Sequence, residues 1–404
     1  MTRPTIHPFL MNLLRESSTQ PIAPAPDDVA QWDSLIEAAE QHNLLPALSH
    51  WLTGLEERER THALVLKRMK PLLAGIAVQN LMLTEELALI LRRLHQRQIP
   101  CMPIRGPALA EQLYGDVTAR AMGDLDLLVQ RERLSDVAQT LAELDYREID
   151  RRPGFARTYS YTLEFVKTRH GSIYVEPHWT IAYPPFADLV DMDGVWQRAR
   201  ASKVVGVDTL ALSRTDLLLH LCFHLIHKGE QAPLLWSYEL DRLIRQDPDA
   251  IDWPHIVHTA RQTGQGELLA NILSEVHALF DSPIPGAVVA QLTAWPEARQ
   301  DGPPRGFWHR RFTPLLLGES GVDGRESLAQ LLAMKGLGAK WRYVCGILFP
   351  SSDFMRTHYG LSECGHPWLG VRYVARLLSV LWEGSKGLVS LVAFRPTPRQ
   401  SPPR

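Results

Sequence analysis

The strongest constraint on the fold is the segment 120–129, which reads RAMGDLDLLV. Its apolar end, residues 127–129, is typical of a buried strand. Side chains on a strand alternate between two faces. Asp124 and Asp126 therefore share one face, while Leu125 takes the opposite face, toward a core. The segment predicts a strand that carries two carboxylates side by side.

Two carboxylates on one face repel each other unless a positive group compensates them. Three solutions are open: a divalent cation, a shared proton or a nearby arginine. Mg²⁺ prefers carboxylate oxygens and is commonly held by one or two carboxylates together with substrate phosphates. The alternative is an edge strand or a loop in which both aspartates face water. The motif alone does not choose between these interpretations, so the rest of the chain must.

Composition excludes several classes of protein. The 404 residues suffice for two or three domains, and the net charge of −2 gives no overall basic field for nucleic acid or an anionic membrane. The four cysteines show no CxxC spacing, which argues against a disulfide framework or a zinc–thiolate site. Neither a secretory signal nor an apolar run of about 18 residues is evident. We therefore expect a cytoplasmic protein with no membrane span.

Hydrophobic spacing divides the chain into helical regions around a short β-rich part. We predict helices over 72–98, 134–144, 215–228 and 234–244 from apolar residues that recur at helical spacing. The predicted parts are a helical region 1–98, a core 99–205, a helical domain 206–300, a helical region 301–394 and a disordered tail 395–404. Proline-rich linkers are expected at 21–28 and 295–304. The fold class is therefore α+β.

A glycine turn precedes the two aspartates. Residues 99–104 are apolar and bounded by prolines, as in a short strand. Gly106 and Pro107 follow, and residues 108–114 then predict a helix, with proline favoured at its start. Such a turn directs backbone N–H groups and a helix N-terminus outward, which makes an anion site. The alternative is an ordinary strand-to-helix connection.

A third carboxylate follows on a predicted hairpin. Residues 159–166 and 172–179 are strand-like and are joined by a turn that contains glycine. On the second strand, Tyr174, Glu176 and His178 share one face. Glu176 is either a surface residue or a site carboxylate. His178 beside it either supports the site or packs against Trp179.

Three histidines lie on one face of the predicted helix 215–228. His220, His224 and His227 stand at positions i, i+4 and i+7. This spacing permits metal binding, but no HExxH pattern accompanies it. A buried, hydrogen-bonded helix face beside Trp236 is the favoured interpretation.

The order of these features has a chemical logic. Nucleotidyl transfer depends mainly on positioning and on charge neutralisation. Two metal ions about 3.5–4 Å apart can activate the attacking oxygen and stabilise the leaving one. Three carboxylates on neighbouring strands can hold both ions, and a helix N-terminus can hold a triphosphate.

The chain resembles a known family at three blocks. IRGPALAEQLYG, RAMGDLDLLV and YVEPHW resemble the blocks of a bacterial uncharacterised nucleotidyltransferase family in the DNA polymerase beta-like superfamily. The resemblance covers roughly residues 80–245, and LLLHLCFHLIHKG and LLWSYELDRL are similar to the family's helical region. It implies a small mixed β-sheet nucleotidyltransferase core flanked by N-terminal and C-terminal helical regions.

The resemblance also implies roles for individual acids. Asp124 and Asp126 would be catalytic ligands of both metal ions. Glu176 would be the third acid, which helps to bind the catalytic metal and activates the acceptor hydroxyl. The implied cofactor is Mg²⁺, or Mn²⁺ in its place.

The implied nucleotide-binding residues are Arg105, Gly106 and Arg120. Gly106 would open the turn over the triphosphate. Arg105 and Arg120 would contact or position phosphates, for which the planar guanidinium is suited. The chain departs from the wider superfamily at one point: Pro107 follows Gly106 where serine or glycine is usual, and it offers neither a hydroxyl nor an N–H.

The predicted function is metal-dependent transfer of NMP from an NTP to an acceptor hydroxyl, with release of pyrophosphate. One alternative is a weak or inactive nucleotide-binding or scaffold protein of the same fold, which Pro107 favours. Another is a toxin-like enzyme that modifies tRNA or protein. The acceptor, whether a small molecule, tRNA or a protein, is left open by the sequence, as is the oligomeric state.

Overall fold

The computed structural model describes residues 8–15, 29–54, 60–149, 156–157, 160–168, 171–183, 186–294, 331, 337–349, 355 and 370–379. The chain forms two compact units, Met1–Ile149 with Tyr161–Glu297, and Asp150–Ser160 with Ala298–Arg404. The predicted linkers 21–28 and 295–304 and the predicted tail 395–404 lie outside the described residues. The fold and the candidate site belong to the first unit.

A small mixed sheet forms the centre of the first unit. Its strands are β1 (Cys101–Pro103), β2 (Asp124–Val129), β3 (Arg147–Glu148), β4 (Phe165–Thr168) and β5 (Ser172–His178), in the spatial order β1-β2-β5-β4-β3. β2 and β5 run parallel, and the remaining neighbours are antiparallel. The predicted α+β fold with a small mixed sheet is confirmed.

The register of β2 on β5 decides where the acids lie. Asp126 is paired with Glu176, and Asp124 is paired with Tyr174. Paired residues on neighbouring strands point to the same face of a sheet. The two acids therefore lie side by side, while Leu125 and Val175 are buried on the opposite face.

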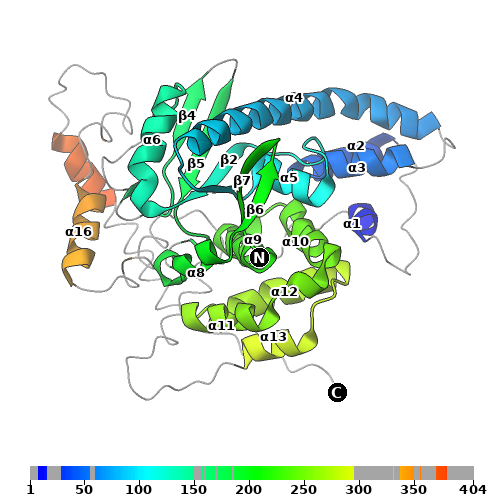
Figure 1. Ribbon diagram of the computed structural model, residues 1–404. Helices are drawn as coiled ribbons and strands as arrows, with labels where there is room; N and C mark the ends of the chain where they lie inside the picture. The colour runs from blue at the N-terminus through cyan, green and yellow to red at the C-terminus, as the bar shows by residue number, and fades with distance from the viewer. Residues whose placement is uncertain are drawn as a thin grey trace. The chain divides into compact units, whose positions relative to one another are not determined.

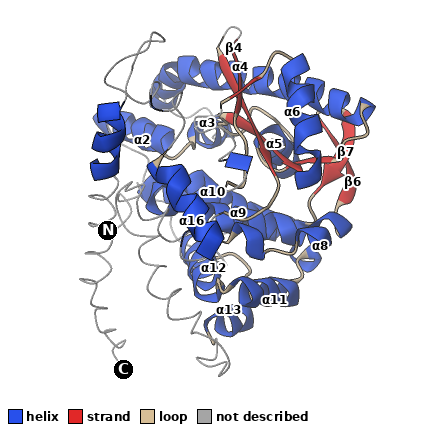
Figure 2. Cartoon of the chain, turned by 90° about the vertical axis from the view of Figure 1, so that its left-hand side faces the viewer, coloured by secondary structure: helices blue, strands red, loops and turns tan. Residues whose placement is uncertain are grey.

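Helices lie on both sides of the sheet (Figure 1). α4 (Arg60–Gln96) runs above it and contacts α5 (Gly106–Tyr114), α6 (Leu134–Glu143) and β2. α9 (Arg214–Lys228) and α10 (Leu234–Gln246) lie below it (Figure 2). The remaining described helices of this unit are α1 (Pro8–Leu14), α2 (Val29–Gln41), α3 (Leu45–Gly54), α8 (Met192–Gln197), α11 (Trp253–Thr263), α12 (Gly266–Phe280) and α13 (Gly286–Thr293), together with short 3₁₀ turns.

The helices predicted from spacing are present, and α4 begins earlier than expected. The C-terminal half of α4 packs against the rest of the unit. Leu83, Leu87 and Ile90 are buried, and Glu86 forms an ion pair with Lys167 on β4. Within the described residues, the stretch Val65–Gln96 is the one helix long and apolar enough to span a bilayer, by length and composition only. Charged side chains such as Glu85 and Glu86 interrupt this stretch, so it is not an uninterrupted apolar run, and the expected lack of a membrane span stays a prediction.

The hairpin of β6 (Arg200–Val204) and β7 (Val207–Ala211) was not expected from the sequence. Its two turn residues, Val205 and Gly206, both have positive φ, at 45° and 76°. A two-residue hairpin turn needs such angles and usually uses Asn-Gly or Asp-Gly. A valine there gives no recognisable signal. The predicted boundary between residues 205 and 206 falls inside this turn.

The second unit is helical where it is described. α16 (Leu337–Leu348) and the helix 370–379 fall in segments that were predicted to be helical. The guanidinium of Arg376 donates to the carbonyl of Ile347, which links the two helices.

Gly106 lets the chain turn closely over β2. It begins α5 at φ +59°, and a Cβ there would lie 3.2 Å from the backbone carbonyl oxygen of Asp124. The left-handed conformation costs other residues about 1–2 kcal/mol, and the contact with rigid backbone adds to that cost.

We therefore expect Gly106→Ala to lower the free energy of unfolding by about 1–2 kcal/mol or more, measured by urea denaturation. Gly75→Ala is the matched control, because Gly75 lies within α4 and a Cβ added there would meet nothing within 4 Å. Alanine there should be neutral or should stabilise by up to about 1 kcal/mol. Equal effects of the two substitutions would contradict the account of the turn.

Candidate active site

Asp126 is the centre of the candidate site. It is 2% exposed. Its Oδ1 lies 2.9 Å from Nε2 of His178, and its Oδ2 forms an ion pair with Nη2 of Arg105 at 2.7 Å. A buried carboxylate needs such compensation, because burial strongly disfavours an unpaired charge. Both oxygens of Asp126 are thus held by groups that can carry positive charge.

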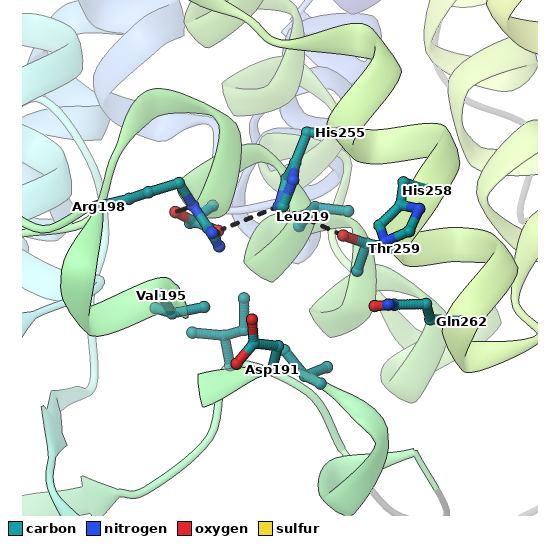
Figure 3. Close-up of a pocket in the computed structure, with 11 residues that line it drawn as sticks. Asp191, Val195, Arg198, Leu219, His255, His258, Thr259 and Gln262 are labelled. Carbon is teal, nitrogen blue, oxygen red and sulfur yellow. Dashed lines mark hydrogen bonds and ion pairs between the residues drawn. The ribbon is translucent and has the colours of Figure 1, made fainter. Parts of the chain in front are cut away.

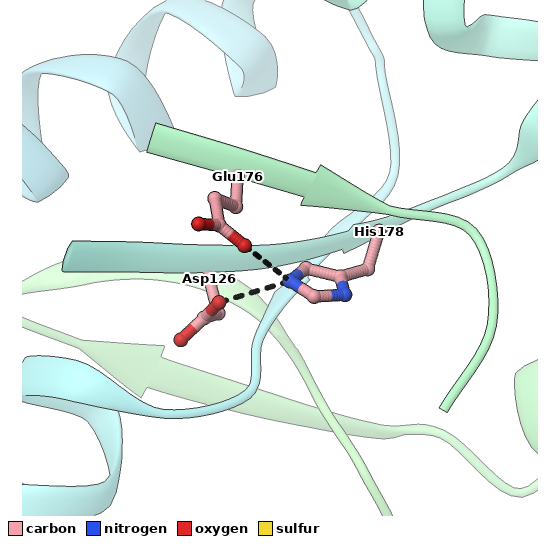
Figure 4. Close-up of side chains that lie close together, drawn as sticks. All are labelled: Asp126, Glu176 and His178. Carbon is pink, nitrogen blue, oxygen red and sulfur yellow. Dashed lines mark hydrogen bonds and ion pairs between the residues drawn. The ribbon is translucent and has the colours of Figure 1, made fainter. Parts of the chain in front are cut away.

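Glu176 and His178 complete a group that could hold a cation. His178 Nε2 lies 3.6 Å from Oε2 of Glu176, and one ligand atom each from Asp126, Glu176 and His178 lie within 4.8 Å of one another (Figure 4). Two ligands that bind a cation at about 2.1 Å, at right angles, are about 3 Å apart. The spacing of the three atoms therefore fits ligands around a single cation.

The pKa of Asp124 shows the repulsion between Asp124 and Asp126 that the sequence predicted. The negative charge of Asp126, followed by burial, raises the pKa of Asp124 to about 6. Burial also opposes the charge of Asp126, but Arg105 and the hydrogen bond from His178 outweigh it, so the pKa of Asp126 is below its usual range. The pKa of His178 is raised: burial disfavours its charge, and hydrogen bonds to Asp126 and Glu176 prevail.

Arg105 links the acids to helix α9. It precedes α5 and is largely buried, with 12% of its side chain exposed. Its Nη1 lies 2.5 Å from Nε2 of His224. Burial and the charge of Arg105 keep the pKa of His224 well below its usual range. Neutral His224 can therefore accept from Arg105 through Nε2 and donate from Nδ1 to the hydroxyl of Tyr183, 2.7 Å away.

Gly106 and Arg120 are joined by a hydrogen bond. Arg120 is buried and forms an ion pair with Glu239 on α10, with Nε and Oε1 2.6 Å apart. The Nη1 of Arg120 donates to the carbonyl of Gly106 at 3.4 Å. The side chain of Asn80 donates to the backbone carbonyl of Arg120 at 2.6 Å. Arg120 thus supports the glycine turn from inside the protein. Direct contact with phosphate, as the sequence predicted for Arg120, stays a prediction.

The histidine face of α9 is largely buried, with His220 and His224 buried and His227 half-buried, as the favoured interpretation expected. Nδ1 of His220 lies 2.9 Å from the carbonyl oxygen of Ile181. The ring of His227 stacks on Tyr183, with centroids 4.5 Å apart, and that of His224 lies 4.0 Å from Trp236. Among the described residues, the metal-ligand group does not include these histidines.

A separate cavity of about 190 Å³ lies between α8, α9 and α11 (Figure 3). Arg198 holds buried Asp216 with two hydrogen bonds, at 2.9 and 2.7 Å. His255 lies 4.0 Å from the same carboxylate. None of the residues that line the cavity belongs to the acid group.

Sequence reasoning expected these acids to lie together but missed their neighbours. Alternation placed Asp124 and Asp126 on one face, the order of the motifs and the family resemblance added Glu176, and the role of His178 was left open. It did not identify Tyr183 or Glu239. The only signal for Glu239 was a charged residue on the apolar face of a helix, since its partner Arg120 is 119 residues away in the chain.

Comparisons with known proteins gave one match. A family model described as uncharacterised nucleotidyltransferase matches residues 28–281. Neither the curated proteins nor the solved structures contain a match.

The buried histidines predict a loss of stability in acid. Burial lowers the pKa of His220 to about 3 and that of His227 to about 4, against about 6.5 in an unfolded chain. As pH falls from about 6.5 to 4, the unfolded state binds more protons than the folded state. The free energy of unfolding should then fall by up to about 1.4 kcal/mol per pH unit for each histidine.

His220→Gln and His227→Gln should each flatten this slope, measured by urea denaturation between pH 7.5 and 4.5. Above pH 7 they should leave the pH dependence unchanged. His50→Gln, at an exposed position on α3, should keep the wild-type slope. An unaltered slope in both His220→Gln and His227→Gln would refute the assignment.

Proposed function

Because the chain belongs to the uncharacterised nucleotidyltransferase family, we propose that it transfers NMP from an NTP to an acceptor hydroxyl and releases pyrophosphate. The observation that supports this most is the pairing of Asp126 with Glu176 on adjacent parallel strands. The pair lies beside a glycine turn that opens a helix. Such an arrangement suits phosphoryl chemistry, in which positioning and charge neutralisation do most of the catalysis.

The acid group fits a divalent cation, with Asp126, Glu176 and His178 as ligands and Asp124 beside them. Carboxylate oxygens suit Mg²⁺ and Mn²⁺, whereas an imidazole nitrogen suits transition metals better than Mg²⁺. The donor set therefore fits Mn²⁺ at least as well as Mg²⁺. When bound, the cation supplies charge neutralisation at the phosphates and lowers the pKa of a bound hydroxyl.

The chain's own groups complete the proposal. Glu176 has 27% of its side chain exposed while that of Asp126 is fully buried, so Glu176 is the acid placed to meet an acceptor hydroxyl and take its proton. The start of α5 faces the triphosphate with the N–H groups of Gly106 and Ala108, because Pro107 has none. Arg105 supplies the guanidinium fork that phosphates favour.

A second candidate function keeps nucleotide binding without turnover. Two observations favour it: Pro107 removes one phosphate-binding N–H, and Asp126 is already compensated by Arg105 and His178. Thermal shifts with each NTP, with and without Mg²⁺ or Mn²⁺, followed by a pyrophosphate-release screen, separate the two. Stabilisation by NTP without pyrophosphate release across many acceptors would favour the second candidate.

The class of acceptor is best approached with each α-labelled NTP in cell extract. A label on tRNA or protein would indicate a macromolecular acceptor, as in a toxin-like enzyme. A label on a small molecule would indicate a metabolic transferase. We propose that the reaction takes place in the cytoplasm.

Asp126→Asn and Glu176→Gln should each lower NMP transfer by about 100-fold or more, because each removes a carboxylate that the proposed reaction needs. His178→Gln should weaken Mn²⁺ binding by about 10- to 100-fold. Transfer is measured with α-labelled NTP, and Mn²⁺ binding by electron paramagnetic resonance. Asp193→Asn, at an exposed position on α8, is the control and should match wild type. Wild-type metal and nucleotide binding in both acid variants would refute the proposal.

A further inference from the structure

Arg105 forms an ion pair with Asp126, one of the three residues of the group that could hold a divalent cation. Its Nη2 lies 2.7 Å from Oδ2 of Asp126, and the other carboxylate oxygen is taken by His178. The side chains of both partners are largely or fully buried. The charge of Asp126 is thus balanced within the chain itself, by a side chain that was expected to bind phosphate.

We propose that Arg105 is a resident counter-ion of the metal site, displaced from Asp126 by the divalent cation and received by the phosphates of the NTP. His224 and Tyr183 are its positioning residues. This inference rests on the proposed function and adds to it an exchange of charges that couples the binding of cation and nucleotide.

The exchange follows from the charges of Arg105, Asp126 and the divalent cation. A guanidinium and a divalent cation on the same carboxylate repel each other strongly in a buried setting. The cation can therefore bind Asp126 well only as Arg105 withdraws. A buried guanidinium that has lost its carboxylate needs a new anion. The phosphates of an NTP provide one, with oxygens that match the guanidinium fork.

His224 lets Arg105 change partners without leaving the site. It accepts from Nη1, on the arm of the fork that does not contact Oδ2 of Asp126. Its own orientation is fixed by the hydroxyl of Tyr183 and by the ring of Trp236. With Nη1 held, the guanidinium can exchange Asp126 for phosphate at Nη2 through a small rotation. Since binding free energies are reciprocal, cation and NTP should each strengthen the binding of the other.

The test measures Mn²⁺ affinity of the full chain at about pH 8 by electron paramagnetic resonance, without nucleotide. Arg105→Gln should bind Mn²⁺ roughly 5- to 150-fold more tightly than wild type, because the competing charge is gone. Arg105→Lys keeps a charge but cannot bridge Asp126 and His224, so it should show a smaller gain. The same Arg105→Gln variant should bind α,β-methylene ATP, in EDTA, more weakly than wild type.

Two further variants separate this role from a structural one. His224→Leu should raise Mn²⁺ affinity to a value between those of wild type and Arg105→Gln, since Arg105 is then held less firmly. Arg198→Gln is the matched control: it also leaves a buried carboxylate, that of Asp216, without its arginine. Its Mn²⁺ affinity should equal that of wild type. An equal gain in Arg198→Gln would overturn the proposal, because any carboxylate left without its arginine would then be enough to tighten Mn²⁺ binding.

The remaining outcomes are also decisive. Mn²⁺ binding that is lost in Asp126→Asn but is no tighter in Arg105→Gln than in wild type would overturn this inference and leave the proposed function standing. If neither wild type nor Arg105→Gln binds Mn²⁺, both this inference and the proposed function would be overturned. Circular dichroism checks that each variant is folded, and the comparison of Arg105→Lys with wild type decides the matter if Arg105→Gln does not fold.

Discussion

The parallel pairing of β2 with β5 is the constraint on which the rest of the site depends. It sets Asp126 directly beside Glu176 on one face of the sheet. Two adjacent acids, one of them fully buried, require positive charge close by. Arg105 from the turn before α5 and His178 from β5 itself meet this requirement. Much of the surrounding structure serves to hold those two side chains.

The positive charge of Arg105 also explains which side chains α9 presents to the site. A helix that faces the arginine of a buried ion pair cannot present another cation without cost. It presents histidines that burial keeps neutral, since the pKa values of His220 and His224 are both lowered. A neutral imidazole can accept from one partner and donate to another. It is thus suited to hold Arg105 through His224 and to lie against the aromatic rings of Tyr183 and Trp236.

Local patterns revealed more of this site than long-range partners did. Alternation along each strand predicted that Asp124 and Asp126 share one face and that Glu176 and His178 share a face of another strand, because that property depends only on neighbours in the chain. Whether these two faces coincide depends on the pairing of β2 with β5, which alternation does not indicate. The partner of Arg120 is 119 residues away, and nothing in the spacing of either residue indicates it. The pairing of Arg105 with Asp126 was likewise hidden, since it depends on how the turn closes over β2. The unexpected β6–β7 turn shows the same limit, because Val205 is a poor signal for positive φ.

Two buried arginine–carboxylate pairs flank Gly106, and their surroundings give them different roles. Arg120 and Glu239 are both enclosed, with side chains 6% and 1% exposed, and the pair lies between α10 and the glycine turn. Breaking it would leave a buried charge with no replacement partner. Asp126 instead adjoins Glu176, whose side chain is partly exposed to solvent. A buried arginine–carboxylate pair therefore stabilises the turn at one position and, in the proposed exchange, changes its partner at the other.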